Sequence, residues 1–177
     1  MPLLTSGRRV TIRQVTPMDT EVVQRFVREL GARTRYYRYC SAIRELPDSL
    51  LARVVNVDGR CSATLLAMVE GDRPATVAMG EYHAQGNEGV CEIALVVADD
   101  WQREGLGTLL LRELAVRASS FALRVIEGFV LYDNAAMLGF ARRHGFRLGP
   151  SGFGPSIVRA SKAIEGRARL REERISA

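Results

Sequence analysis

The segment at residues 95–114, LVVADDWQREGLGTLLLREL, constrains the fold more than any other stretch of the chain. An apolar run gives way to charged residues, then to Gly105 and Gly107, and then to an amphipathic run. Glycine inside a helix costs about 1 kcal/mol relative to alanine, so two glycines at a helix start indicate a need for bare backbone. The first N–H groups of a helix lack intrahelical partners and carry partial positive charge. The segment therefore predicts a strand–loop–helix unit whose loop can hold a phosphate, although an ordinary junction remains the alternative.

Hydrophobic periodicity predicts a mixed α/β sheet around this unit. Helices are expected from Pro17, with Thr16 as N-cap and Gly31 as the stop, and from near Asp48. A third helix is expected at about residues 105–118, and a fourth begins after Asp133 or Asn134 and ends at Gly145. The expected strands are residues 9–15, 62–70, 76–84, 90–97, 124–131 and 156–160. The length of 177 residues suits a single domain over 1–177, with a core at 8–160 and a polar tail at 161–177.

Composition excludes several classes of protein. No apolar run approaches the roughly 20 residues of a membrane span, and the start lacks a signal peptide, so we expect a cytoplasmic protein without a membrane partner. Cys40, Cys61 and Cys91 show no pairing or ligand spacing, which argues against a disulfide framework and a metal site. Residues 1–60 hold eleven arginines against six acidic residues. This charge is compatible with nucleic acid, an acidic protein partner, a phosphate-rich ligand or a merely solvated surface.

Two motifs at the proper spacing carry a resemblance to a known family. The run Gln102-Arg103-Glu104-Gly105-Leu106-Gly107 resembles the Gln/Arg-x-x-Gly-x-Gly/Ala signature of the GNAT superfamily of acetyl-CoA-dependent N-acetyltransferases. Residues 134–146, NAAMLGFARRHGF, are similar to the family's asparagine-led helix that ends in Gly-Phe. The resemblance covers most of residues 8–160. It implies a GNAT fold, in which helices flank a central, mostly antiparallel mixed sheet that splays between its fourth and fifth strands.

The same resemblance implies where acetyl-CoA, the co-substrate, would bind. Backbone N–H groups of the glycine loop would hold its diphosphate, namely those of Gln102, Arg103, Glu104, Gly105, Leu106, Gly107 and Thr108. Leu95, Val96 and Val97 would pair with the amides of the pantetheine arm, and Asn134, Met137 and Phe140 would lie near that arm. For the side chains of Met137 and Phe140, packing in the core is the simpler interpretation.

Acetyl transfer to an amine requires a neutral nucleophile, whereas a lysine amine has an ordinary pKa near 10.4. Deprotonation at neutral pH costs about 4–5 kcal/mol, so a general base helps. Glu92, a carboxylate within an apolar strand, is the first candidate, and the resemblance also favours it. If Gly86 and Asn87 form a two-residue turn, Glu81 faces Glu92 and becomes the second candidate. A shift of one residue would instead bring Tyr82 opposite Glu92, and a shift of two would bring His83, the third candidate.

A general acid is harder to assign. Many family members place a tyrosine where this chain has Ala141, and Tyr132 is expected to face elsewhere. A departing thiolate with a pKa near 8.5 needs little help.

The acceptor is predicted from the segment RTRYYRYCSAIRELPDSLLARVVNVD, which follows the first helix. With VVADDWQREGLGT, it resembles the acetyltransferase domain of bacterial protein-lysine acetyltransferases that modify acyl-CoA synthetases. Arginines interleaved with tyrosines, Arg35 to Tyr39, suit an acidic protein surface, so Arg35 and Arg38 are expected to serve the partner. The alternatives are half-buried packing of the tyrosines, a small-molecule amine as acceptor, or a non-catalytic acyl-CoA sensor. Nucleic acid is disfavoured, and a dimer is possible.

Overall fold

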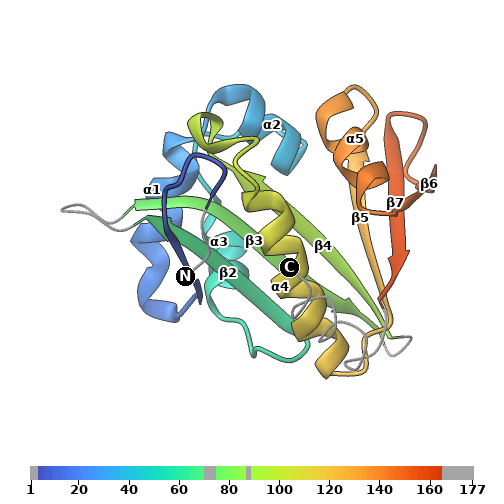
Figure 1. The fold of residues 1–177 in the computed structure, drawn as a ribbon, viewed down its shortest axis with the longest axis horizontal. Helices are drawn as coiled ribbons and strands as arrows, with labels where there is room; N and C mark the ends of the chain where they lie inside the picture. The colour runs from blue at the N-terminus through green and yellow to red at the C-terminus, as the bar shows by residue number, and fades with distance from the viewer. Residues whose placement is uncertain (1–3, 70–74, 87–88, 165–177) are drawn as a thin grey trace.

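The computed structural model describes residues 4–69, 75–86 and 89–164. Within them seven strands form one sheet in the order β1-β2-β3-β4-β5-β7-β6 (Figure 1). Only the β4–β5 pairing is parallel. The strands are β1 (Val10–Gln14), β2 (Ser62–Val69), β3 (Ala75–Gln85), β4 (Val90–Val97), β5 (Val125–Leu131), β6 (Arg147–Pro150) and β7 (Ile157–Ala163). The helices are α1 (Thr20–Glu29), α2 (Ala32–Tyr39), α3 (Asp48–Val55), α4 (Leu106–Ser120) and α5 (Ala135–Arg143), with short 3-10 turns η1 (Pro17–Asp19) and η2 (Asp99–Trp101).

Two apolar cores lie on opposite faces of this sheet. Leu65 and Tyr82 pack with Leu110 and Leu114 of α4 on one face. On the other face, Leu66, Met79 and Val96 pack against apolar residues of α1 and α3. Side chains alternate between the faces along a strand, so each face receives every second residue of β2, β3 and β4. The glutamates of β3 and β4 therefore share the face that α1, α2 and α3 cover.

The predicted splay between the fourth and fifth strands is confirmed. β4 pairs with β5 only through Val90, Cys91 and Glu92, which face Val125, Ile126 and Glu127. Beyond Glu92 the two strands diverge, and they run apart toward α2 on one side and α5 on the other (Figure 1). The end of the pairing at Glu92 sets the position of the site.

Several elements differ from the expectation. Leu30 ends α1, and Gly31 caps the start of α2, a helix that was not predicted because it buries no residue and so shows no apolar period. The four-residue strand β6 was also missed, since it is too short for a pattern. β7 continues to Ala163, three residues into the predicted tail, whereas residues 165–177 of that tail lie outside the described residues.

Candidate functional site

The glycine loop leaves the first turn of α4 open. α4 begins at Leu106, and no side chain caps its N-terminus. Gly105 has a φ of 91°, a left-handed conformation that favours glycine, and a Cβ there would meet nothing within 4 Å. Arg103 is also left-handed, with a φ of 64°. Uncapped helix N–H groups are suited to binding an anion, and the diphosphate site at this loop stays a prediction.

Gly107 serves a different purpose, which is close packing. A Cβ at Gly107 would lie 3.3 Å from Cε2 of Phe140, so the ring of Phe140 rests against the first turn of α4. His144, which the sequence did not point to, packs against Phe140 with ring centroids 4.3 Å apart and ring planes tilted by 48°. Its Nε2 lies 3.0 Å from Oγ1 of Thr108. These contacts hold the C-terminal end of α5 against the first turn of α4.

Two of the predicted loop residues turn their side chains away from this space. The Glu104 carboxylate accepts hydrogen bonds from the Ser6 N–H at 2.9 Å and from Arg8 at 3.1 Å. These interactions hold the pKa of Glu104 below its ordinary value. The Arg8 guanidinium in turn lies 3.6 Å above the Trp101 ring. The Gln102 amide donates to the Val97 carbonyl at 3.3 Å. The Gln102 N–H also donates to the Asp99 carbonyl at 3.3 Å, so the predicted contact of this N–H with the diphosphate is wrong, whereas Glu104 can offer its backbone N–H but not its carboxylate.

The alternation of peptide groups along β4 distinguishes the three predicted pantetheine partners. The Ala98 N–H donates to the Val77 carbonyl at 2.9 Å, which directs the peptide groups of Ala98, and by alternation of Val96, toward β3. Those of Leu95 and Val97 then face the side of β5, where pairing has already ended. The peptide groups of Leu95 and the N–H of Val97 can thus pair with an extended ligand, whereas the Val97 carbonyl already accepts from Gln102 and the peptide groups of Val96 are committed to β3.

Asn134 is held by its own helix. It is buried, and its Oδ1 accepts a hydrogen bond from the Met137 N–H at 3.1 Å, which caps α5. Ala141 is buried in the core and provides no hydroxyl, while Tyr132 is 71% exposed. No tyrosine hydroxyl therefore stands at the position where many relatives place a general acid.

The register of the β3–β4 hairpin differs from the first expectation. His83, and not Glu81, faces Glu92, and Glu81 faces Ala94. The last pair is Gln85 with Val90, so the connection contains four residues rather than two. Gly86 and Gly89 both adopt positive φ values there, and Asn87 lies outside the described residues. The predicted opposition of the two carboxylates is therefore wrong, and the alternative with a two-residue shift is correct.

Glu81 and Glu92 consequently have different surroundings. Glu81 is buried and forms an ion pair with Arg38 of α2, with Nη2 2.5 Å from Oε1. Glu92 is half-buried and accepts a hydrogen bond from the Gln85 amide at 3.1 Å. Burial lowers the pKa of His83, so the imidazole facing Glu92 is uncharged near neutral pH. Among these three candidates, Glu92 is the carboxylate without a cationic partner in the described part of the chain.

Buried polar atoms without hydrogen-bond partners lie close to Glu81 and His83. Among the described residues, six buried side-chain polar atoms have no hydrogen-bond partner, and five of them lie here. They are Nε of Arg38, the hydroxyls of Tyr39 and Thr64, Oε2 of Glu81 and Nε2 of His83. Burial raises the pKa of Tyr39 to about 12. Natural proteins seldom leave buried polar groups unpaired, so internal water is expected beside Glu81 and His83.

The arginines expected to meet a protein partner are used inside the fold. The Arg35 guanidinium donates to the carbonyls of Leu30 and of Ile43, the latter at 3.0 Å, and Arg38 is committed to Glu81. The hydroxyl of Tyr37 reaches the Asp133 carbonyl at 3.4 Å, on the far side of the splay. Tyr37 thus links α2 to the segment that follows β5, and Arg35 and Arg38 hold α2 in place.

No cluster of three or more metal-ligating side chains occurs in residues 4–69, 75–86 and 89–164. The helices within those residues are all too short or too polar to cross a membrane.

Comparisons with known proteins agree with this geometry. Residues 25–146 match the acetyltransferase (GNAT) family. The chain is 35% identical over 144 residues to an acetyltransferase of Pseudomonas aeruginosa, covering 81% of this chain and 77% of that one. It is 30% identical over 141 residues to acetyltransferase Pat of Mycolicibacterium smegmatis, covering 79% of this chain but only 42% of Pat. The fold matches the GNAT domain of S. lividans PAT with a TM-score of 0.84, at 23% identity and 92% and 94% coverage. The chain therefore belongs to the GNAT family of acetyltransferases.

Proposed function

We propose that this acetyl-CoA-dependent N-acetyltransferase transfers the acetyl group to lysine side chains of proteins, with Glu92 as the general base. One observation carries the assignment of the base. Glu92 occupies the last paired position of β4 and β5, so its carboxylate stands where the strands begin to separate. A group at this point can reach an amine that approaches a thioester lying between the two strands.

The chain's own residues divide the work of binding and proton transfer. Acetyl-CoA supplies the activated acetyl group. The uncapped first turn of α4 would bind the diphosphate of acetyl-CoA. The peptide groups of Leu95 and the N–H of Val97, which face the side of β5, would pair with the pantetheine arm and align it. Glu92 would then accept a proton from the ammonium group of the acceptor, which frees the lone pair that attacks the acetyl carbonyl. The C–N bond of the amide forms as the C–S bond of the thioester breaks, and CoA leaves as a thiolate that needs little help to depart. The Gln85 amide orients the Glu92 carboxylate through its hydrogen bond to Oε2.

The choice of a protein lysine rests on sequence similarity. The stretch that aligns with Pat includes the glycine loop and most of the chain, although this chain spans less than half the length of Pat. An acceptor protein such as an acyl-CoA synthetase is therefore part of the proposal.

The proposal is tested by incubating a bacterial lysate with labelled acetyl-CoA and the purified protein, followed by mass spectrometry of acetylated lysines. We expect specific lysines to gain label with the wild-type protein and to lose nearly all of it with Glu92→Gln. Label confined to small amines would refute the protein acceptor, and equal labelling by Glu92→Gln would refute the base.

A further inference from the structure

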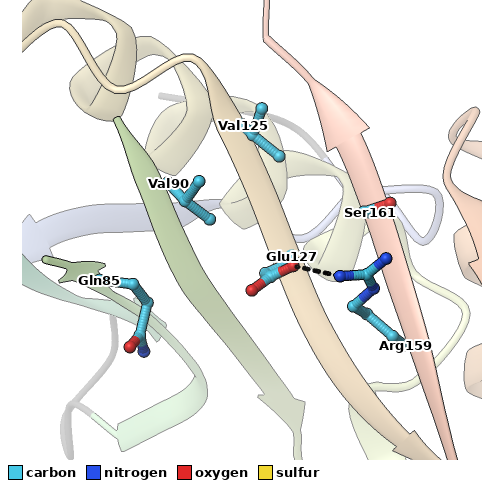
Figure 2. A pocket seen from close by; sticks show the side chains of 6 residues that line it. All are labelled: Gln85, Val90, Val125, Glu127, Arg159 and Ser161. Atoms are coloured by element: carbon cyan, nitrogen blue, oxygen red, sulfur yellow. Dashed lines mark ion pairs between the residues drawn. The ribbon is translucent and has the colours of Figure 1, made fainter. Parts of the chain in front are cut away.

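A pocket of about 340 Å³ opens on the sheet beside Glu92. Figure 2 shows Glu127 of β5 at its centre, with Arg159 and Ser161 of β7 on one side. Val90, Val125 and Gln85 complete the lining. The pocket therefore combines an anionic group, a cationic group and two aliphatic side chains on one face of the sheet.

The pocket is continuous with the proposed base. Glu92 and Glu127 are directly paired across β4 and β5, so their side chains leave the same face of the sheet on adjacent strands. Gln85, which lines the pocket, also donates the hydrogen bond to Glu92. Two neighbouring carboxylates attract a cation such as an ammonium group, and the β-branched side chains of Val90 and Val125 offer contacts to an alkyl stem.

Glu127 and Arg159 are close to each other without being tightly bound. Oε2 of Glu127 lies 3.9 Å from Nη1 of Arg159, which is too long for a hydrogen bond. The Glu127 side chain is 18% exposed and the Arg159 side chain is 51% exposed. A pair at this distance with a half-exposed arginine is weakly coupled, so each group remains able to bind a charge on a ligand.

We infer that this pocket binds the acceptor and selects an amine that has a carboxylate group next to it. Glu127 receives the ammonium group beside Glu92, while Arg159 receives the carboxylate through charge-assisted hydrogen bonds. The carboxylate can come from an acidic residue adjacent to a target lysine or from the α-carboxylate of a free amino acid. The inference rests on the proposed acetyl transfer and adds the chemistry that the acceptor must carry.

Binding of two matched probe pairs to the CoA-saturated protein, measured by calorimetry, tests this inference. The first pair is a blocked Gly-Glu-Lys-Gly peptide and its Gly-Gln-Lys-Gly twin, and the second is free lysine and lysinamide. We expect the wild type to bind the carboxylate-bearing member of at least one pair about tenfold more tightly, since one charge-assisted hydrogen bond distinguishes the members. Arg159→Gln should bring that ratio close to one. Arg112→Gln, which removes an exposed arginine of α4, should leave the ratio unchanged.

The outcomes separate this inference from the proposed function. Equal affinities within both pairs would overturn the inference, and so would a preference that survives in Arg159→Gln. Acetylation of both peptides at equal rates, together with equal affinities, would leave the lysine acetyltransferase proposal standing while the carboxylate selection fails. A preference confined to free lysine would support the pocket's role and contradict the protein acceptor.

Discussion

Two glutamates on one face of the sheet show how surroundings separate the roles of identical residues. Glu81 is a buried counter-ion of Arg38, whereas Glu92 is half-buried and held by a neutral amide. A buried ion pair contributes little to stability relative to apolar replacements, but removing one partner leaves an uncompensated charge in the interior. Glu81 is therefore assigned to anchoring α2, and Glu92 is available to a substrate.

The anchoring role predicts strong coupling between Arg38 and Glu81. Arg38→Met should lower the free energy of unfolding by about 3–5 kcal/mol, because the Glu81 charge stays buried alone. The double variant Arg38→Met/Glu81→Gln should recover more than half of that loss. Urea unfolding of the wild type, both single variants and the double variant gives the coupling free energy. Losses that simply add would show that the two residues do not act as a pair.

Hydrogen bonds of Ser6 and Arg8 join the N-terminal residues to the glycine loop before α4. Residues 4–9, which we call the N-terminal arm, are joined to the glycine loop because the Ser6 N–H and the Arg8 guanidinium both donate to the Glu104 carboxylate. A carboxylate next to a bound diphosphate would repel it, so the arm neutralises a charge that the loop itself introduces. The same arm places the Arg8 guanidinium on Trp101 at the end of η2.

This arrangement predicts that Arg8 acts on acetyl-CoA affinity through Glu104. Arg8→Ala should weaken acetyl-CoA binding by about tenfold, because the Glu104 charge is then exposed to the diphosphate. Glu104→Gln in the same chain should restore most of the affinity. Calorimetry measures the binding, with Arg9→Ala, an exposed neighbour, as the matched control. If the double variant binds no better than Arg8→Ala, the arm acts by another route.

The 3-10 turn η1, which leads into α1, is held by the Asp19 carboxylate, and this makes the free energy of unfolding sensitive to acid. Asp19 accepts hydrogen bonds from Arg13 at 2.6 and 2.8 Å and from the Thr16 N–H at 2.7 Å. The Arg13 guanidinium is the main reason that the pKa of Asp19 lies well below its ordinary value. Because the folded pKa is lower than the unfolded value near 3.9, the contribution is complete above about pH 4 and is lost as the pH falls further.

Asp19→Asn should therefore lower the free energy of unfolding at pH 7 by about 2–4 kcal/mol. It should also flatten the decline in stability between pH 4 and pH 2.5, because the titrating group is gone. Urea unfolding midpoints of the wild type and the variant at pH 7, pH 4 and pH 2.5 measure both effects. An undiminished acid decline in Asp19→Asn would assign the sensitivity to other carboxylates.

For the whole molecule, the sequence predicted six of the seven described strands and the strand–loop–helix unit because each depends on a local pattern, whereas the splay was implied by the family resemblance. The apolar alternation of β2, β3 and β4 and the two glycines before α4 all lie in contiguous stretches. What it could not predict depends on register and on distant contacts. The two-residue shift at the hairpin moved Glu81 away from Glu92, and the pairing of Arg38 with Glu81 joins residues 43 positions apart. The pocket at Glu127 and Arg159 likewise depends on β5 and β7 being neighbours.

The central claim, that Glu92 is the base of an acetyl transfer, is tested most directly by the turnover of Glu92→Gln at saturating acetyl-CoA. Rates are measured on the lysines identified in the lysate, and acetyl-CoA affinity is measured by calorimetry on the same preparations. We predict that turnover falls about 10²–10⁴-fold while acetyl-CoA affinity stays near that of the wild type, since the substitution removes a proton acceptor and keeps the shape. Near-normal turnover in Glu92→Gln, beside an inactive His83→Gln, would contradict the account and assign the base to the facing histidine.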